Sequence, residues 1–206
     1  LQDQIESKEQ LLQVIQSLDN QAAAQLIAKV DPKLAASALR TIDQEIAVNI
    51  SNKLSDSAWH LVEQHLPEEV RTQWKRNANF PEGSIGRMME PAWAVFPPEM
   101  KVSEAIEVLR DIVKREFITY GYVIDRQQKL VGVLVMRDLL FAEPTQSLEE
   151  IMLPNPFSLK ADTDLMDGMK EVLVKHYPVY PVTNESDQLM GVVRGHTLFE
   201  AQAVEI

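Results

Sequence analysis

The sequence predicts an α+β protein in which an all-α superhelical array of short helices precedes two copies of one α/β module. Two repeats indicate this fold. In the first third of the chain, apolar residues that close short helical stretches recur at every twelfth position. In the C-terminal half, a strand-rich pattern around Gly132 returns around Gly191. Repeats of these lengths indicate small supersecondary units that bury a shared face by stacking on each other.

The regular spacing in the first third predicts helices of about eight residues joined by tight turns. The residues that close its successive apolar stretches are Leu18, Val30, Ile42, Leu54 and Leu66. A polar pair follows each of them, and the Asp or Ser in most of these pairs can accept hydrogen bonds from the free N–H groups at a helix start. We therefore expect the array to cover residues 1–76. A linker is expected at 77–86, where Pro81 and Gly83 break the helical pattern.

The two α/β modules are expected at residues 87–148 and 149–206. Each is predicted to run strand, helix, strand, turn, strand, helix. Apolar residues at helical spacing predict the first helix of each module, with Ser103 and Thr163 as the expected caps. Gly132 and Gly191 lie inside predicted strands, where glycine indicates the close approach of a neighbour or a ligand.

The composition excludes several classes of function. The chain has 20 basic and 31 acidic residues and a formal net charge of −11, which argues against a nucleic-acid partner. It has no cysteine, so it holds neither a disulfide nor a thiolate metal site. The longest apolar run, Leu130 to Met136, is far shorter than the ~20 residues of a membrane-spanning helix. No nucleophile motif, zinc-protease motif or phosphate-binding loop is present, so we do not expect an enzyme.

The ordered motifs of the C-terminal half resemble a known family, the tandem cystathionine-β-synthase (CBS) domains or Bateman pair. The resemblance is carried by Ile151-Met152 with Pro154, the Leu-x-Gly pattern at Gly132 and Gly191, and Arg137-Asp138-Leu139-Leu140. With the preceding array, the chain is similar to the cytosolic region of MgtE-type magnesium transporters. This resemblance implies a regulatory region that senses intracellular Mg²⁺ and gates a transmembrane pore downstream in the same parent chain. It also implies a soluble, cytoplasmic part of a membrane protein that forms a homodimer through CBS helices.

The resemblance further implies regulatory Mg²⁺ sites on carboxylates. The residues that match are Asp162, Asp164, Asp167, Glu200 and Glu205. The alternative is that these are ordinary helix-start and solvent-facing charges. Where family members carry acids, this chain has His176, Gly195, His196 and Thr197. Because Mg²⁺ prefers carboxylate and water oxygens to imidazole, we expect weak Mg²⁺ binding.

CBS pairs often bind adenosine nucleotides, which implies a nucleotide site at Arg137 and Asp138. Val135 stands where the family pattern has a hydroxyl residue, so half of the motif is missing. Alternatively, Asp138 is a helix cap. A second possible function is a soluble CBS-domain adaptor that binds an adenosine nucleotide or a partner protein.

Overall fold

The computed structural model describes residue 5 and residues 7–204, and it divides into two compact units. Unit 1 extends to Glu82, and unit 2 begins at Gly83. Within the described residues, no helix is long and apolar enough to cross a membrane.

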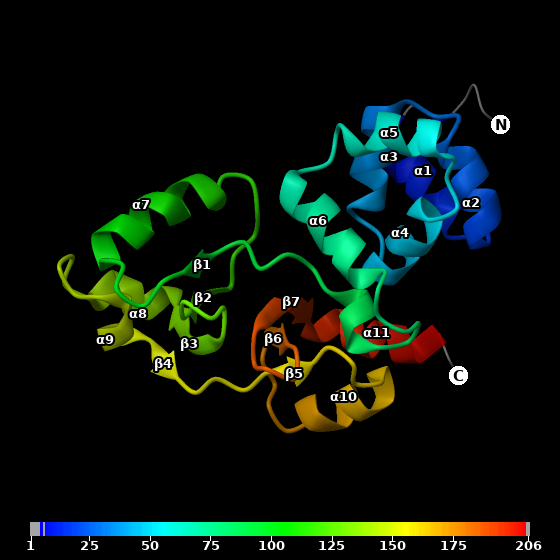
Figure 1. Cartoon of the computed structure of the whole chain (residues 1–206). Helices are drawn as coiled ribbons and strands as arrows, with labels where there is room; N and C mark the ends of the chain where they lie inside the picture. Colours follow the sequence, from blue (N-terminus) through cyan, green and yellow to red (C-terminus); the bar gives the residue numbers. More distant parts are fainter. Residues whose placement is uncertain (1–4, 6, 205–206) are drawn as a thin grey trace. The chain divides into compact units, whose positions relative to one another are not determined.

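Unit 1 is the predicted array of short helices (Figure 1). Its helices are α1 (Lys8–Ile15), α2 (Asn20–Ile27), α3 (Pro32–Leu39), α4 (Gln44–Ser51), α5 (Asp56–Glu63) and α6 (Glu68–Asn77). Their starts are evenly spaced along the chain, at every twelfth position, which confirms the repeat. The expected polar caps are present at α2 to α5, where the side chains of Asp19, Asp31, Asp43 and Ser55 accept backbone N–H bonds.

Each helix of unit 1 packs mainly on the helix two places further along the chain: α1 on α3, α2 on α4, α3 on α5 and α4 on α6. Fully buried alanines such as Ala35 and Ala47 let these helices approach closely. One buried polar contact crosses the array: the Trp74 indole Nε1 donates a hydrogen bond to Gln44 Oε1 at 2.8 Å. A single helix of this length would be marginal in water, so the stability comes from this stacking.

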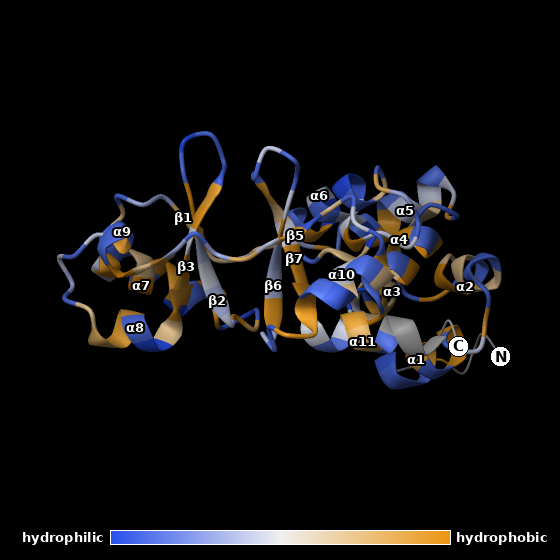
Figure 2. Ribbon diagram, turned by 90° about the horizontal axis from the view of Figure 1, so that it is seen from below, coloured by the Kyte–Doolittle hydropathy of each residue, from blue (hydrophilic) through white to orange (hydrophobic). Residues whose placement is uncertain are grey.

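Unit 2 contains two small sheets, each built in the predicted order. The first module comprises β1 (Val95–Phe96), α7 (Val102–Ile112), β2 (Tyr120–Ile124), β3 (Leu130–Val135), α8 (Met136–Phe141) and α9 (Leu148–Ile151). The second comprises β5 (Leu159–Lys160), α10 (Leu165–Val172), β6 (Val179–Thr183), β7 (Leu189–Arg194) and α11 (Gly195–Val204). In each sheet a parallel pair is followed by an antiparallel hairpin. In Figure 2, β3 and β7 are mainly hydrophobic and the hairpin loops hydrophilic.

The two modules exchange their leading segments. The 3₁₀ turn η2 (Ile85–Met88), which precedes the first module, packs on β5 and β7, and Glu90 then pairs with Val192 of β7. Conversely, β4 (Leu153–Pro154), which precedes the second module, pairs with β3 of the first. The hairpin loops also meet, because Leu130 N donates to Asp187 O at 2.9 Å. These contacts hold the modules in unit 2 together as a pseudo-symmetric pair.

Gly132 allows the close approach of a neighbour, as expected, because a Cβ there would lie 2.2 Å from Met152 Sδ.

The two predicted module caps were wrong. Helix α7 begins at Val102, so Lys101 and not Ser103 holds the cap position. Helix α10 is capped by Asp164, whose Oδ1 accepts from Met166 N at 2.9 Å, and not by Thr163. Aspartate outcompetes its neighbour because its carboxylate accepts the free N–H groups more strongly.

Candidate functional site

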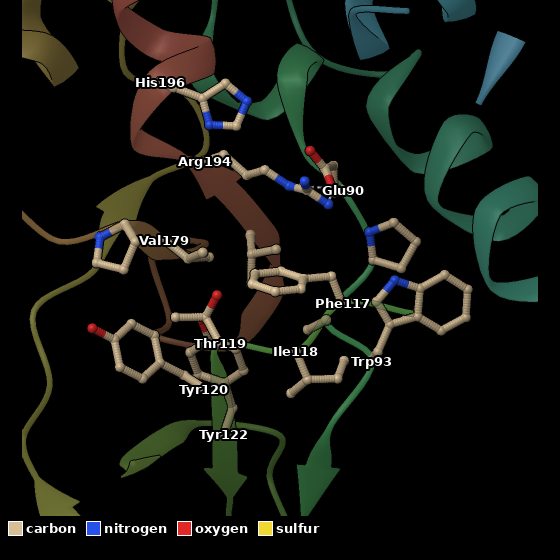
Figure 3. Close-up of a pocket in the computed structure, with 14 residues that line it drawn as sticks. Glu90, Trp93, Phe117, Ile118, Thr119, Tyr120, Tyr122, Val179, Arg194 and His196 are labelled. Atoms are coloured by element: carbon tan, nitrogen blue, oxygen red, sulfur yellow. Dashed lines mark hydrogen bonds and ion pairs between the residues drawn. The ribbon is translucent and has the colours of Figure 1, made fainter. Parts of the chain in front are cut away.

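Two clefts lie between the modules of unit 2, and the repeat relates them to each other. The first, called the Glu90 cleft, lies between segment 90–93, β2 and β7, with a volume of about 150 Å³ (Figure 3). The second, called the Phe157 cleft, lies between segment 153–157, β3 and β6, with a volume of about 270 Å³. Tyr120 and Val179, which occupy equivalent positions of the two modules, line both clefts.

The equivalent positions of the two clefts carry different chemistry. Glu90 in the first cleft corresponds to Leu153 in the second, because each stands between a methionine and a proline at the start of its module. Arg194 likewise corresponds to Val135, since each is the last residue of its hairpin. The Glu90 cleft therefore contains an acid and a base where the Phe157 cleft is apolar.

An ion pair bounds the Glu90 cleft. Arg194 donates from Nη2 to Glu90 Oε2 at 2.9 Å and from Nε to the same oxygen at 3.1 Å. Figure 3 shows Arg194 reaching from the end of β7 towards Glu90, with His196 beside it at the start of α11. Because Glu90 neutralises Arg194, the cleft presents little net charge to a ligand.

The floor of the Glu90 cleft contains a buried hydroxyl group that has no hydrogen-bond partner in the described part of the chain. It belongs to Tyr122, a residue that is 3% exposed. Burial, with a smaller contribution from Tyr120, raises the pKa of the Tyr122 phenol far above its ordinary value. The hydroxyl therefore stays protonated and can both donate to and accept from a ligand. Trp93 and Phe117 add aromatic surface around it (Figure 3).

The Phe157 cleft is lined by three aromatic side chains, those of Tyr120, Phe157 and Tyr177. Its wall includes Val135, the last residue of β3, and α8 starts at the next residue. The cleft therefore presents flat apolar surfaces beside the first turn of a helix. Such a combination suits a planar ligand that carries polar groups at one end.

The predicted nucleotide residues lie in this first turn of α8, next to the Phe157 cleft but not among its lining residues. Asp138 is the third residue of α8, and its Oδ1 lies 3.4 Å from Arg137 Nε. The Asp138 side chain is 32% exposed, and that of Arg137 is 77% exposed. The alternative interpretation of Asp138 as a cap is wrong, because Val135 holds the cap position.

The predicted metal residues are spread along unit 2. Asp164 caps α10, and Asp167 forms an exposed ion pair with Lys170 at 2.7 Å. Asp162 and Glu200 are exposed, whereas Glu205 lies outside the described residues. Among the residues that the structure describes, no three His, Cys, Asp or Glu side chains are grouped to hold a metal ion. The assignment of these five residues to Mg²⁺ stays a prediction.

Sequence reasoning missed the polar residues of the Glu90 cleft. Both residues lie in the repeated module, but nothing local marks them as site residues. Glu90 contributes through its contacts with Val192 and Arg194 of the second module, and Tyr122 through its burial in the sheet. A comparison of the repeats could have found them. Glu90 opposite Leu153 and Arg194 opposite Val135 are points at which the two copies differ in charge.

Comparisons with known proteins agree with this architecture. The sequence profile of the CBS domain family matches residues 85–144 and 148–203. The magnesium transporter MgtE of Thermus thermophilus is 31% identical over 144 residues, which cover 68% of this chain and 32% of that protein. The magnesium transporter MgtE of Bacillus subtilis is 33% identical over 120 residues, 56% of this chain and 26% of the relative. The chain thus spans between a quarter and a third of these relatives.

Two solved structures share the fold over nearly the whole chain. A crystal structure of the soluble part of a magnesium transporter superposes with a TM-score of 0.73 at 23% identity, covering 94% of this chain and 86% of the other. A crystal structure of the cytosolic domain of the Mg²⁺ channel MgtE in complex with ATP gives a TM-score of 0.68 at 23% identity. It covers 97% of this chain and 92% of the other.

Proposed function

Because the chain belongs to the CBS domain family and is homologous to the MgtE magnesium transporters, we propose that it is the cytosolic regulatory region of a magnesium transporter. In this role it senses intracellular Mg²⁺ and controls a pore formed by another part of the parent protein. The observation that carries the proposal is the order of parts, a repeated array of short helices followed by a CBS pair. We assign residues 1–76 to the array, 77–86 to the linker, and 87–148 and 149–206 to the two modules. The region has a regulatory role and catalyses no reaction.

The acidic start of α10 is the part of unit 2 that we assign to Mg²⁺ sensing. It adjoins the segment through which the chain enters this unit, because Leu165 N donates to Gly83 O at 2.9 Å and Ser84 pairs with Asp164. Carboxylates at this position repel any other acidic side chains that come close to the Gly83–Ser84 segment. A divalent cation bound between them turns that repulsion into attraction. The described carboxylates form no ready cage, so we expect a response only at millimolar Mg²⁺.

The test of Mg²⁺ sensing is compaction of the protein. Scattering radius and resistance to protease are measured from zero to tens of millimolar Mg²⁺ (a range set by the weak binding expected). Neutralising Asp162, Asp164 and Glu200 together, each to its amide, should abolish the Mg²⁺ dependence. A control that neutralises three exposed acids elsewhere, Glu69→Gln, Glu99→Gln and Glu143→Gln, makes the same change in net charge and should respond like the wild type. A wild-type scattering radius that does not change with Mg²⁺ would overturn the proposed Mg²⁺ sensing.

We also propose that the Phe157 cleft binds an adenosine nucleotide. The related cytosolic domain has been crystallised with ATP. In this chain the aromatic walls of the cleft suit a purine ring, and Asp138 beside it can accept hydrogen bonds from ribose hydroxyls. Calorimetry with ATP and AMP should show binding that Asp138→Asn weakens roughly tenfold. Asp111→Asn, on the exposed face of α7, is the matched control. Nucleotide binding without any Mg²⁺ response would favour the soluble adaptor instead.

Dimer formation is proposed through the CBS helices. On α8, Leu140 is 81% exposed and Phe141 is 83% exposed, and Phe199 on α11 adds further apolar surface. Adjacent apolar side chains exposed in this way mark an interaction surface, and two copies of one face form a twofold interface. Light scattering at tens of micromolar (a concentration suited to interfaces of ordinary affinity) should show a dimer. Leu140→Ser with Phe141→Ser should produce the monomer, and a wild-type monomer would contradict the proposal.

A further inference from the structure

The helical array of unit 1 contains a cavity of about 350 Å³ that no part of the proposed function uses. Its wall is formed by one face of α6, which carries Arg71, Trp74 and Lys75, and by the turn between α4 and α5 together with Trp59. Arg71 and Lys75 are four positions apart, so they lie on the same side of the helix. The volume is within the range of small-molecule sites in proteins.

Within the part of the chain that the structure describes, the cations in this cavity have no anionic partner. Arg71 Nε is buried and makes no hydrogen bond within the described residues, and neither Arg71 nor Lys75 forms an ion pair there. A buried guanidinium nitrogen without an acceptor is costly, and two like charges at this spacing repel each other. One acid, Asp56, also lines the cavity, which leaves a formal charge of +1 on its wall. This is unusual in unit 1, where residues 1–82 contain 8 basic and 12 acidic side chains.

The rest of the wall is aromatic and polar. Trp59 and Trp74 lie with ring centroids 6.1 Å apart and a tilt of 31°. The Trp74 indole is already bonded to Gln44, so Trp59 is the ring available to a ligand. Ser51 and Asn52 add polar groups at the end of α4.

We propose that this cavity binds a small organic anion, namely an aromatic ring that carries a phosphate or a carboxylate group. The anionic group lies against Arg71 and Lys75, where it supplies the missing acceptor for Arg71 Nε. The ring lies against Trp59, as planar groups do on indole surfaces. Asp56 selects against ligands with more than one or two negative charges, because it adds repulsion on the same wall. The site is independent of the CBS clefts.

The experiment titrates the whole chain with phenyl phosphate, benzoate, inorganic phosphate and phenol, and it follows the indole N–H signals of the three tryptophans by NMR. Phenyl phosphate or benzoate should shift Trp59 in a saturable way, and the better of the two identifies the anionic group. Phenol and inorganic phosphate should bind roughly tenfold more weakly or worse, because each lacks half of the recognised chemistry. Trp93, which lies in the Glu90 cleft, reports any separate binding there.

Arg71→Gln should weaken binding of the preferred probe roughly tenfold, the effect of losing a charge-assisted hydrogen bond. Lys33→Gln is the control, because it removes one exposed cation of the same unit that is remote from the cavity wall. If the Arg71 variant does not fold, Lys75→Gln replaces it and should weaken binding roughly threefold, as expected for an exposed charge. An unchanged Trp59 signal at saturating probe, or equal binding by the Arg71 and Lys33 variants, would overturn the proposal.

Discussion

Glu90 and Arg194 are far apart in sequence and form an ion pair at 2.9 Å across the exchanged segment of unit 2. Backbone bonds between Glu90 and Val192 run in both directions beside it, at 2.8 and 2.9 Å. The first module is thus fastened to the last strand of the second by both main-chain and side-chain contacts. At the equivalent point, Leu153 and Val135 make the Phe157 cleft apolar.

We predict that Glu90 and Arg194 can be replaced by the residues at the equivalent positions of the other repeat, a leucine and a valine. Glu90→Leu alone should destabilise the fold by about 1 kcal/mol, because it leaves the half-buried Arg194 without its acid. Adding Arg194→Val should recover most of that loss, since a buried or half-buried pair is often replaced by apolar residues at little cost. Urea unfolding of the two single variants and the double variant measures the coupling. If the free energy of unfolding lost in the double variant equals the sum of the losses in the two single variants, the two side chains have no coupling energy and the prediction is wrong.

The contact between Gly132 and Met152 gives a second prediction. Gly132→Ala should destabilise the protein by about 1–3 kcal/mol, because the new methyl group would overlap the Met152 side chain from Cβ to Sδ. Met152→Ala in the same chain removes Cγ and Sδ, the two atoms that overlap most, so the double variant should be more stable than the Gly132 variant. Thermal unfolding of the three proteins provides the measurement, and equal melting temperatures for the Gly132 variant and the wild type would contradict the close approach.

Much of the fold follows from local signals in the sequence. The regular spacing of apolar residues placed the helices of unit 1 because each turn contains its own capping residue, such as Asp31 before α3. The order of strands and helices in unit 2 follows from the repeat that relates Gly132 to Gly191. The exact cap positions at Lys101 and Asp164 did not follow, because several neighbouring polar residues can serve as a cap and tertiary contacts select one.

The candidate clefts were only partly predictable. Arg137 and Asp138 belong to a motif within one segment, the start of α8, which directly follows Val135 of the Phe157 cleft. Their assignment to a nucleotide stays a prediction. Glu90, by contrast, reaches Arg194 only after the two modules have exchanged their leading segments, and the buried hydroxyl of Tyr122 is visible only in the folded sheet. Likewise, Arg71 looks like an ordinary surface cation in the sequence, and its lack of a partner within the described chain is visible only when α5 and α6 are packed together.

Within unit 1, the hydrogen bond from Trp74 to Gln44 should contribute measurably to stability. Gln44→Leu should cost about 1–3 kcal/mol, because it leaves a buried indole N–H without an acceptor. Gln21→Leu, an exposed position on α2, makes the same chemical change without this loss. In a Trp74→Phe background the Gln44 change should cost much less, and urea unfolding followed by circular dichroism can test that difference. An equal cost in both backgrounds would mean that Gln44 acts through packing alone.

The last prediction concerns the buried hydroxyl of Tyr122. Tyr122→Phe should leave stability at neutral pH unchanged or raise it by up to about 1 kcal/mol, because it removes a buried polar group that has no partner in the described chain. Tyr180→Phe is the contrast: its hydroxyl accepts from Tyr177 N at 2.9 Å and donates to Val172 O, so its loss should destabilise the fold. The pH dependence adds a second test. Burial raises the pKa of Tyr122 in the folded state above its ordinary value of 10.0.

The contribution of the Tyr122 phenol to stability is therefore complete below its ordinary pKa of 10.0 and is lost as the pH rises from there towards the folded-state pKa. Between the ordinary pKa of 10.0 and the folded-state pKa, wild-type stability should fall more steeply with pH than that of the Tyr122→Phe variant. Tyrosinate absorbance should show one of the four tyrosines ionising only as the protein unfolds. Parallel stability curves for the wild type and the variant in alkali would mean that the phenol is solvated in the folded protein. Destabilisation of the variant at neutral pH would mean that the hydroxyl has a hydrogen-bond partner in solution.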